Sequence, residues 1–395
     1  MLFNELFPAN INGSPIDRHS TEALAHIPYK TELELKNCAV RQLLQNGQIS
    51  IVPNEVVPSP LPRKYRTTTK RRVFFNGRKV FLHFGKKPNP GINIADSALE
   101  PDEHLKIYTF LQKFFSTPAN FKASSALNYL IIRGSYSERI LIFNTKRLSG
   151  DIIRILKNAV NKLIDFDNAL RGAFIYVDES GSDYYLEVER PAKGVNFKKL
   201  YGTDFLALKL NGRKFLYSPL SFSQINESIL PLFFDEFKKY LTPAANDILM
   251  DMYCGYGLWS LTAGDMFKNA WGVELAPLSV KSAQSNAKFH FPGKNFRYEC
   301  GFVTSEYLRK TMPPTRKENE WILLDPPRQG CAAGVLEYLI SRKPGKIFHL
   351  FCGADEIVPA LKIYLANNCK IEALIPFDFF PGTLNIEMLA VISCG

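Results

Sequence analysis

The chain has 395 residues, 46% of them hydrophobic, which is enough for two or three domains with sizeable cores. Its formal charge of +11, from 49 basic and 38 acidic residues, favours a polyanionic partner, nucleic acid before membrane, although a basic enzyme without such a partner fits as well. Seven scattered cysteines without a CxxC pair argue against a disulfide framework and against a zinc or iron–sulfur site. With no basic leader and no apolar run near the ~18 residues of a membrane span, we expect a reduced, cytoplasmic location.

Residues 1–58 predict one helix followed by a proline-rich linker. The stretch from Tyr29, YKTELELKNCAVRQLL, repeats its apolar residues at helical spacing, and Gly47 ends it. VPNEVVPSPLPR then favours an extended conformation. We expect this segment to pack on the C-terminal domain.

Residues 59–217 predict a basic α+β domain. The stretch RKYRTTTKRRVFFNGRKVFLHFGKK alternates as strands do around an Asn76-Gly77 turn, which is typical of a hairpin. Helices over 104–116 and 151–164 accompany the strands LNYLIIRG, RILIFNT, GAFIYVD and DYYLEVER. Cations beside aromatic rings suit single-stranded RNA, although a solvated hairpin face would look similar. The cations proposed for RNA are Arg63, Lys64, Arg66, Lys70, Arg71 and Arg72, and the same stretch also contains Arg78, Lys79, Lys86 and Lys87.

Residues 218–395 alternate strand and helix, which predicts an α/β doubly wound, Rossmann-like sheet. The expected strands are DILMDMY, AWGVEL, WILLDPP, KIFHLFC, KIEALIPFDFF and IEMLAVIS, with helices over 230–241 and 276–289. The last two strands are joined by PGTLN, which is too short for a parallel crossover. The final strand should therefore run antiparallel.

A glycine turn follows the first of these strands. Gly255 and Gly257 allow a ligand to approach the backbone, and Glu274 ends the next strand, where a carboxylate can accept ribose hydroxyls. A dinucleotide motif would have a third glycine where Ser260 stands, so a cofactor without a pyrophosphate, such as S-adenosylmethionine (SAM), fits better. The alternative is a turn that merely lets helix pack on strand.

Three further side chains should meet the glycine turn at the same edge. Asp325 and Cys352 end parallel strands, and Glu387 begins the antiparallel one. A cysteine that ends an apolar strand is more often part of the core. A buried carboxylate such as Glu387 is harder to explain as packing, because it is costly without a partner.

Several motifs together resemble the RNA uracil carbon-5 methyltransferases, in order along most of the chain. They are HIPYKTELELKNCAV, SPLPRKYRTTTKRR, SPLSFSQIN, DMYCGYGLWSL, GVEL, SAQSNAKF, DPPRQG and FFPGTLNIE. The resemblance implies a SAM-dependent enzyme that forms 5-methyluridine in tRNA or rRNA. It implies that Cys352 is the nucleophile that adds to uracil carbon 6 and that Glu387 removes the carbon-5 proton. Arg328 stands where amino-methylating enzymes usually have an aromatic residue, which favours carbon as the target.

The resemblance also implies that Gln224, Tyr253, Glu274 and Asp325 bind SAM or the target base. The chain departs from the family pattern at FCGADEIVPAL after the nucleophile, at Asn385 and Gly382, and at Cys300-Gly301-Phe302. RHSTEALA stands where some members of the family have the cysteines of an iron–sulfur cluster, so we expect no such cluster. We also expect no other metal, no TRAM domain and a monomeric protein. Two alternatives remain, an RNA-binding protein with lost catalysis and a SAM enzyme that acts on another RNA atom.

Overall fold

The computed structural model describes residues 2–11, 13–84, 96–180, 196–314 and 319–394, and the chain divides into two compact units. Unit 1 comprises Met1–Arg63, Lys209–Leu216 and Ser221–Gly395, and unit 2 comprises Lys64–Leu208 and Tyr217–Leu220. The expected boundaries at 59 and 217 lie close to these, but most of a hairpin over 209–216 belongs to unit 1.

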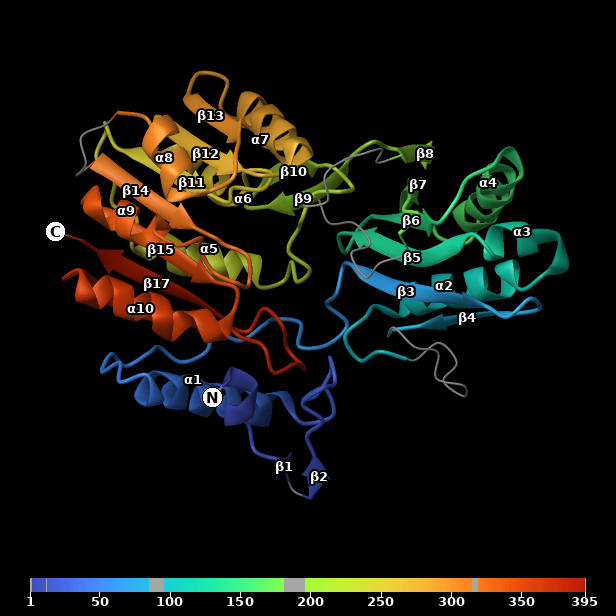
Figure 1. Cartoon of the computed structure of the whole chain (residues 1–395), viewed down its shortest axis with the longest axis horizontal. Helices are drawn as coiled ribbons and strands as arrows, with labels where there is room; N and C mark the ends of the chain where they lie inside the picture. The colour runs from blue at the N-terminus through green and yellow to red at the C-terminus, as the bar shows by residue number, and fades with distance from the viewer. Residues whose placement is uncertain (1, 12, 85–95, 181–195, 315–318, 395) are drawn as a thin grey trace. The chain divides into compact units, whose positions relative to one another are not determined.

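Unit 1 contains a seven-stranded sheet in the order β13-β12-β11-β14-β15-β17-β16 (Figure 1). Its strands are β11 Ile248–Met252, β12 Asn269–Glu274, β13 Asn295–Cys300, β14 Glu320–Leu324, β15 Lys346–Phe351, β16 Lys370–Phe377 and β17 Glu387–Ser393. All neighbouring pairs are parallel except those of β17, which is antiparallel to both β15 and β16. The predicted doubly wound sheet and its antiparallel last strand are confirmed. Strand β13 was not expected, because it is a largely exposed edge strand of sequence NFRYEC.

Helices cover both faces of this sheet. They are α1 Tyr29–Asn46, α5 Leu230–Lys239, α6 Leu258–Thr262, α7 Pro277–His290, α8 Ser305–Thr311, α9 Val335–Ser341 and α10 Ile357–Ala366. Alternate strand residues such as Met250, Ile322 and Ile347 share one buried core with α1, α9 and α10. On the opposite face the Phe348 ring meets Phe237 of α5 with centroids 4.6 Å apart. Burial on both faces explains why these strands are apolar throughout.

The N-terminal segment belongs to unit 1. Phe3, Leu24 and Val40 lie in the same core as the sheet. The proline-rich stretch runs beside edge strand β16, where the Asn54 and Val57 amides each donate to a strand carbonyl at 2.8 Å. This covers an edge that would otherwise expose unpaired backbone groups.

One disulfide joins Cys369 to Cys394, which corrects the expectation from cysteine spacing. The two residues lie 25 positions apart, just outside the paired ends of β16 and β17, where Lys370 faces Ser393. Strand pairing brings them together, and no CxxC spacing is needed.

Unit 2 contains a six-stranded sheet in the order β4-β3-β5-β6-β7-β8. Strands β6 and β7 are parallel to each other, and the other neighbouring pairs of this sheet are antiparallel. Its elements are β3 Thr69–Phe75, β4 Val80–His83, α2 Asp102–Phe115, α3 Phe121–Ser124, β5 Leu127–Gly134, β6 Arg139–Thr145, α4 Gly150–Ile164, β7 Leu170–Val177 and β8 Asn196–Gly202. The expected Asn76-Gly77 hairpin and both helices are present. Helices α2 and α4 pack on one face through residues such as Leu111 and Leu156. The expected strand DYYLEVER, together with Lys86 and Lys87, lies outside the described residues.

The remaining elements are small. They are the 3-10 turns η1 Phe3–Leu6, η2 Pro118–Asn120, η3 Gly264–Met266 and η5 Ala354–Glu356, the short pair β1 Asn10–Ile11 and β2 Ser14–Pro15, and the hairpin β9 Leu206–Leu210 with β10 Arg213–Tyr217. Within the described ranges, no helix is long and apolar enough to cross a bilayer.

Candidate functional site

Strand register brings the candidate side chains to one edge of the seven-stranded sheet. Asp325 directly follows β14, Cys352 directly follows β15, and Glu387 is the first residue of β17. Phe351 pairs with Met388, so the next position along this antiparallel pair places Cys352 beside Glu387. Three residues that are far apart in sequence are therefore neighbours because of sheet topology alone.

The Cys352 thiol donates a hydrogen bond to Asp325. The distance from Sγ to Oδ1 is 3.0 Å, and the other oxygen, Oδ2, accepts from the indole Nε1–H of Trp259 at 2.6 Å. Burial raises the pKa of Asp325 to about 6, although both hydrogen bonds oppose this rise. Burial also raises the pKa of Cys352 well above its usual range, and the nearby carboxylates of Asp325 and Glu387 add to the shift. In this arrangement Cys352 is a thiol with a proton acceptor already in contact.

Glu387 is a buried carboxyl group without an ion-pair partner in the described part of the chain. Burial raises its pKa to about 8, the charge of Asp325 adds to the rise, and Arg328 opposes it. Its Oε2 atom is buried and accepts no hydrogen bond from the described residues. A carboxylate with such a pKa is a stronger base than an exposed one and can exchange its proton near neutral pH.

The loop after Asp325 packs against the loop after Cys352. A side chain at Gly353 would place its Cβ 2.4 Å from the Arg328 carbonyl oxygen, so these two backbones approach as closely as glycine allows. The Arg328 guanidinium lies over the ring of Phe380, 5.5 Å from its centroid. Its positive charge opposes the rise in the pKa of both Cys352 and Glu387. Arg328 is therefore the nearby cation of an otherwise acidic edge.

The glycine turn lies at the end of β11. Tyr253, Gly255 and Gly257 have φ angles of +67°, +54° and +82°, and a Cβ at Gly257 would come within 2.8 Å of Leu261. The Glu274 carboxylate accepts from the Gly255 amide at 3.1 Å and from the Ala276 amide at 2.8 Å. A Cβ at Gly255 would meet no atom within 4 Å. The turn is thus rigid, and open space lies above Gly255.

Two residues of this edge were not foreseen from the sequence, Trp259 and Asp251. Asp251 is fully buried, and burial raises the pKa of its carboxyl to about 7. Its Oδ2 accepts from the Ser260 amide at 3.3 Å, whereas Oδ1 is buried without a partner in the described residues. An acid in the middle of the apolar strand ILMDM is the signal that could have identified it. Gln224, by contrast, is buried, and among the described residues no hydrogen bond joins it to Asp325, Cys352 or Glu387.

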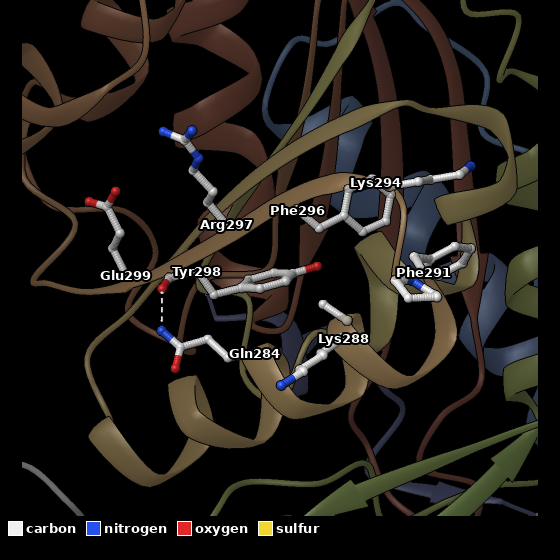
Figure 2. Close-up of a pocket in the computed structure, with 10 residues that line it drawn as sticks. Gln284, Lys288, Phe291, Lys294, Phe296, Arg297, Tyr298 and Glu299 are labelled. Atoms are coloured by element: carbon white, nitrogen blue, oxygen red, sulfur yellow. Dashed lines mark hydrogen bonds between the residues drawn. The ribbon is translucent and has the colours of Figure 1, made fainter.

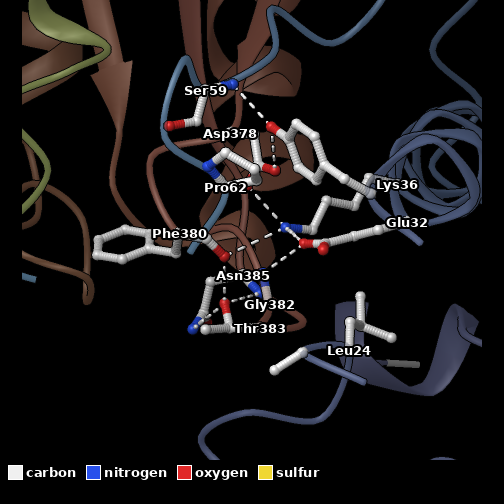
Figure 3. Close-up of polar contacts among 12 residues, drawn as sticks. Leu24, Glu32, Lys36, Ser59, Pro62, Asp378, Phe380, Gly382, Thr383 and Asn385 are labelled. Carbon is white, nitrogen blue, oxygen red and sulfur yellow. Dashed lines mark hydrogen bonds and ion pairs between the residues drawn. The ribbon is translucent and has the colours of Figure 1, made fainter. Parts of the chain in front are cut away.

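A second buried network holds the loop that leads to Glu387 (Figure 3). Lys36 donates to Glu32 at 2.8 Å, to Asp378 at 2.7 Å and to the Phe380 carbonyl at 3.2 Å. Tyr29 donates to Asp378 at 3.0 Å. Through these contacts α1 fixes the segment between β16 and β17, and with it the start of β17.

Arg63, expected among the RNA-binding cations, is part of this network. Its guanidinium donates to Glu32 at 3.1 Å and to the carbonyls of Ala25, Leu24 and Ile27. All its partners are internal. Contacts of this kind depend on residues distant in sequence, which a count of cations in a short stretch cannot show.

Arg71 of unit 2 also has an internal role. It is almost fully buried and makes a two-pronged ion pair with Glu100, at 2.9 and 2.6 Å. Its guanidinium stacks over the rings of Phe84 and Tyr108, 3.7 and 4.5 Å from their centroids. It cannot reach a phosphate without losing these contacts.

The other proposed cations of unit 2 are more accessible. Lys70 and Arg72 are half-buried on strand β3 and lie over the ring of Tyr129, each 5.8 Å from its centroid. Lys64 pairs with Asp102 at 2.8 Å, and Arg66 is partly exposed. Of the six cations proposed for RNA, Arg63 and Arg71 are thus engaged in internal ion pairs. In the described residues, no group of three or more His, Cys, Asp or Glu side chains is arranged to hold a metal ion.

Comparisons with known proteins agree with this architecture. No family model matches the chain. A Thermotoga maritima protein named uncharacterized RNA methyltransferase is 26% identical over 378 residues, which cover 93% of this chain and 81% of that protein. A Staphylococcus epidermidis protein of the same name is 27% identical over 379 residues, which cover 93% and 80%.

A solved structure matches across both units. It is the tRNA (uracil-54, C5)-methyltransferase of Pyrococcus abyssi in complex with S-adenosyl-L-homocysteine, with a TM-score of 0.72 and 20% identity, and the match covers 97% of this chain and 88% of that one. At this level of identity the match establishes a shared fold, a Rossmann-like sheet with a second α+β domain.

Proposed function

We propose that the chain is a SAM-dependent RNA methyltransferase that forms 5-methyluridine in tRNA or rRNA. The observation that carries the proposal is the meeting of Cys352, Asp325 and Glu387 at the edge beside the glycine turn. The names of the relatives and of the structural neighbour, which describe RNA methylation and uracil carbon-5 methylation, support it.

The reaction needs a nucleophile, because uracil carbon 5 is itself a poor one. The Cys352 sulfur would bond to uracil carbon 6 while the electrons of the ring double bond move to form an enolate. The thiol proton would pass to Oδ1 of Asp325, which already accepts it at 3.0 Å. This transfer compensates for the raised pKa of the thiol, because the proton is removed as the sulfur attacks.

The second half of the reaction needs a base. SAM would supply the methyl group that the enolate takes at carbon 5, with cleavage of the sulfur–methyl bond and release of S-adenosylhomocysteine. Glu387 would then remove the proton left on carbon 5, the bond from sulfur to carbon 6 would break, and the ring double bond would form again. The proton held by Asp325 would return to Cys352. With a pKa of about 8, ionised Glu387 is a stronger base for this step than an exposed carboxylate.

The residues at the ends of β11 and β12 fit SAM. Glu274 is held by two amides at a position where it can accept ribose hydroxyls, and open space lies above Gly255. The acidic groups Asp251 and Asp325 suit a cationic sulfonium, and Asp251 has a buried oxygen without a partner in the described residues. We include Tyr253, Gly257 and Gln224 in this site as candidates.

Unit 2 would bind the RNA, and the uridine would be methylated at the sheet edge of unit 1. Uracil carbons 5 and 6 must be approached from the ring face, which is covered inside a helix, so the uridine must be unstacked. Lys70 and Arg72 beside Tyr129, together with Lys64 and Arg66, are the candidates for phosphate contact. We propose that the protein works as a cytoplasmic monomer.

Transfer of labelled methyl from SAM to RNA tests the proposal. We expect wild-type protein to label RNA as 5-methyluridine, identified by mass spectrometry of nucleosides, and Cys352→Ala to lose transfer by at least about 10⁴-fold. Glu387→Gln should retain the addition step and accumulate a covalent RNA adduct, visible as a slow band in a denaturing gel.

Cys300→Ala provides a matched control, because Cys300 is an exposed free cysteine at the end of β13. It should keep wild-type activity. Transfer that survives Cys352→Ala would overturn the proposed chemistry, and a different labelled nucleoside would redirect it to another RNA atom.

An RNA-binding protein without catalysis is the second candidate. It is favoured by the raised pKa of Cys352, which keeps the nucleophile a thiol. Tight RNA binding with no heat of SAM binding in calorimetry would support this candidate over the enzyme.

A further inference from the structure

A groove runs along the outer edge of the seven-stranded sheet, between β13 and the C-terminal half of α7. Its volume is about 470 Å³, which lies in the range of ligand-binding pockets. Figure 2 shows Gln284 and Lys288 on the helix, with Phe296, Arg297 and Tyr298 along the strand. On β13 the groove is lined by Phe296, Arg297, Tyr298 and Glu299, and strands β12 and β11 lie between β13 and β14, the strand that Asp325 follows. The groove is thus separate from the catalytic edge.

One backbone carbonyl of the groove already accepts a hydrogen bond from a side chain. Gln284 Nε2 donates to the Tyr298 carbonyl at 2.9 Å, whereas Lys294 Nζ donates to the carbonyls of Gly264 and Phe267, outside the groove, at 2.6 and 2.8 Å. An added peptide strand would need the carbonyl that Gln284 takes. The groove is therefore unsuited to strand addition, and its occupant should be recognised by side chains.

Three cations of this surface lack ion-pair partners in the described parts of the chain. Lys281 and Lys288 lie two turns apart on the exposed face of α7, and Arg297 lies on β13. The Arg297 Nε atom donates to Asn295 at 3.0 Å, which leaves its terminal nitrogens for other contacts. Glu299 is the acid that lines the same groove. The balance is positive, so the surface suits an anion.

An exposed aromatic ring accompanies these cations. Phe289, the residue after Lys288 on α7, is 78% exposed. Its ring meets only the edge of His290 among the ring contacts of the described residues, with centroids 5.0 Å apart at 84°. A phenylalanine so exposed beside free cations offers a stacking surface for an unpaired base.

We propose that this outer surface, formed by Lys281, Lys288, Phe289 and Arg297, is a second RNA-binding surface of the protein. The cations contact phosphates, and Phe289 stacks on an unpaired base that lies away from the methylated uridine. The inference rests on the proposed function for the identity of the polyanion as RNA. Because the surface lies outside the catalytic edge, it contributes to RNA affinity and leaves the chemical step unchanged.

A charge-matched pair of triple variants tests the inference in the full-length protein. The test variant is Lys281→Ala/Lys288→Ala/Arg297→Ala, and the control replaces three exposed lysines of unit 1 elsewhere, Lys239→Ala/Lys310→Ala/Lys370→Ala. Binding of bulk tRNA and of a fluorescein-labelled single-stranded oligoribonucleotide is followed by anisotropy over a salt series. We expect the test variant to bind about tenfold more weakly, with a salt slope reduced by about two, and the control to bind as the wild type does.

Phe289→Ser separates stacking from charge. It should weaken binding of the single-stranded oligoribonucleotide severalfold and leave the salt slope unchanged. In the methyl-transfer assay both test variants should raise KM for RNA at constant kcat.

Equal loss of binding in the test and control triple variants would overturn the inference, because net charge would then explain the effect. So would wild-type affinity in the test variant, or selective loss of binding to vesicles containing phosphatidylserine, which would identify an acidic membrane as the partner. Failure of the proposed function is distinct, because wild-type protein would then bind RNA without transferring methyl.

Discussion

Unit 1 contains two clusters of buried carboxylates that differ in their partners. In the first, Glu32 and Asp378 are matched by Lys36, Arg63 and Tyr29, so that every carboxylate oxygen accepts a hydrogen bond. In the second, Asp251, Asp325 and Glu387 form no ion pair within the described ranges, and two of their oxygens accept nothing there.

The difference separates structure from chemistry. Burial raises the pKa of Asp378 as well, but the charge of Lys36 opposes the rise, and the paired cluster fixes a loop. In the unpaired cluster the carboxyl pKa values rise to about 6, 7 and 8, a range in which protons can be exchanged near neutral pH. Unpaired buried acids destabilise a fold, so their presence at a strand edge favours a functional interpretation.

Removing the cation of the paired cluster should have the largest effect on stability. Lys36→Met leaves Glu32 and Asp378 buried without their shared partner, and we expect the free energy of unfolding to fall by about 3–5 kcal/mol. All three tryptophans belong to unit 1, so their fluorescence during urea unfolding reports on this unit alone. Arg41→Met on the same helix is the control, because its ion pair with Glu55 is exposed, and it should change stability by less than about 1 kcal/mol. A similar small change for Lys36→Met would remove the distinction between the clusters.

Neutralising an acid of the unpaired cluster should instead raise the free energy of unfolding. The pKa of Glu387 rises from 4.5 to about 8 on folding, so between these values the folded state binds a proton that the unfolded state has lost. This group therefore makes stability fall as pH rises from 4.5 to 8. We expect Glu387→Gln, without cofactor, to be more stable than wild type above pH 8 by up to about 5 kcal/mol, and to lose this advantage below pH 4.5.

Urea unfolding across this pH range measures the difference, with Glu372→Gln as the control. Glu372 pairs with Lys346 and its pKa is lowered, so its removal should bring no gain at high pH. An advantage of Glu387→Gln that does not depend on pH would contradict the raised pKa.

The meeting of Asp325, Cys352 and Glu387 at one sheet edge could be predicted because it depends on topology. Asp325, Cys352 and Glu387 each stand at a strand end, and the direction of each strand follows from the length of its connection. The glycine turn could be predicted for the same reason, because it directly follows a strand of the sheet.

Features that depend on side-chain partners could not be predicted. The roles of Arg63 and Arg71 follow from Glu32 and Glu100, which lie 31 and 29 residues away. Trp259 gave no local sign of its bond to Asp325, since a tryptophan after a glycine turn fits packing equally well. The Cys369–Cys394 bond required the pairing of β16 with β17.

The smallest predicted effect concerns Trp259, which connects the apolar core to the unpaired cluster. Its ring packs against Phe233 and Phe234 with centroids 4.5 and 5.1 Å away, while its Nε1–H lowers the pKa of Asp325. Trp259→Phe keeps an aromatic ring and removes the donor, so the pKa of Asp325 should rise above about 6. In the proposed reaction Asp325 must be ionised to accept the Cys352 proton, so the acid limb of the methyl-transfer rate should move to higher pH, by up to about one unit.

Phe233→Leu separates packing from hydrogen bonding in this measurement. It weakens the support of the indole ring and keeps the bond from Trp259 to Asp325, so transfer should be slower at all pH values while the acid limb stays in place. If both variants moved the limb equally, ring packing would explain the effect, and Asp325 would be tuned by burial alone. If only Trp259→Phe moves it, one hydrogen bond is what keeps an unpaired buried acid ready to accept a proton at neutral pH.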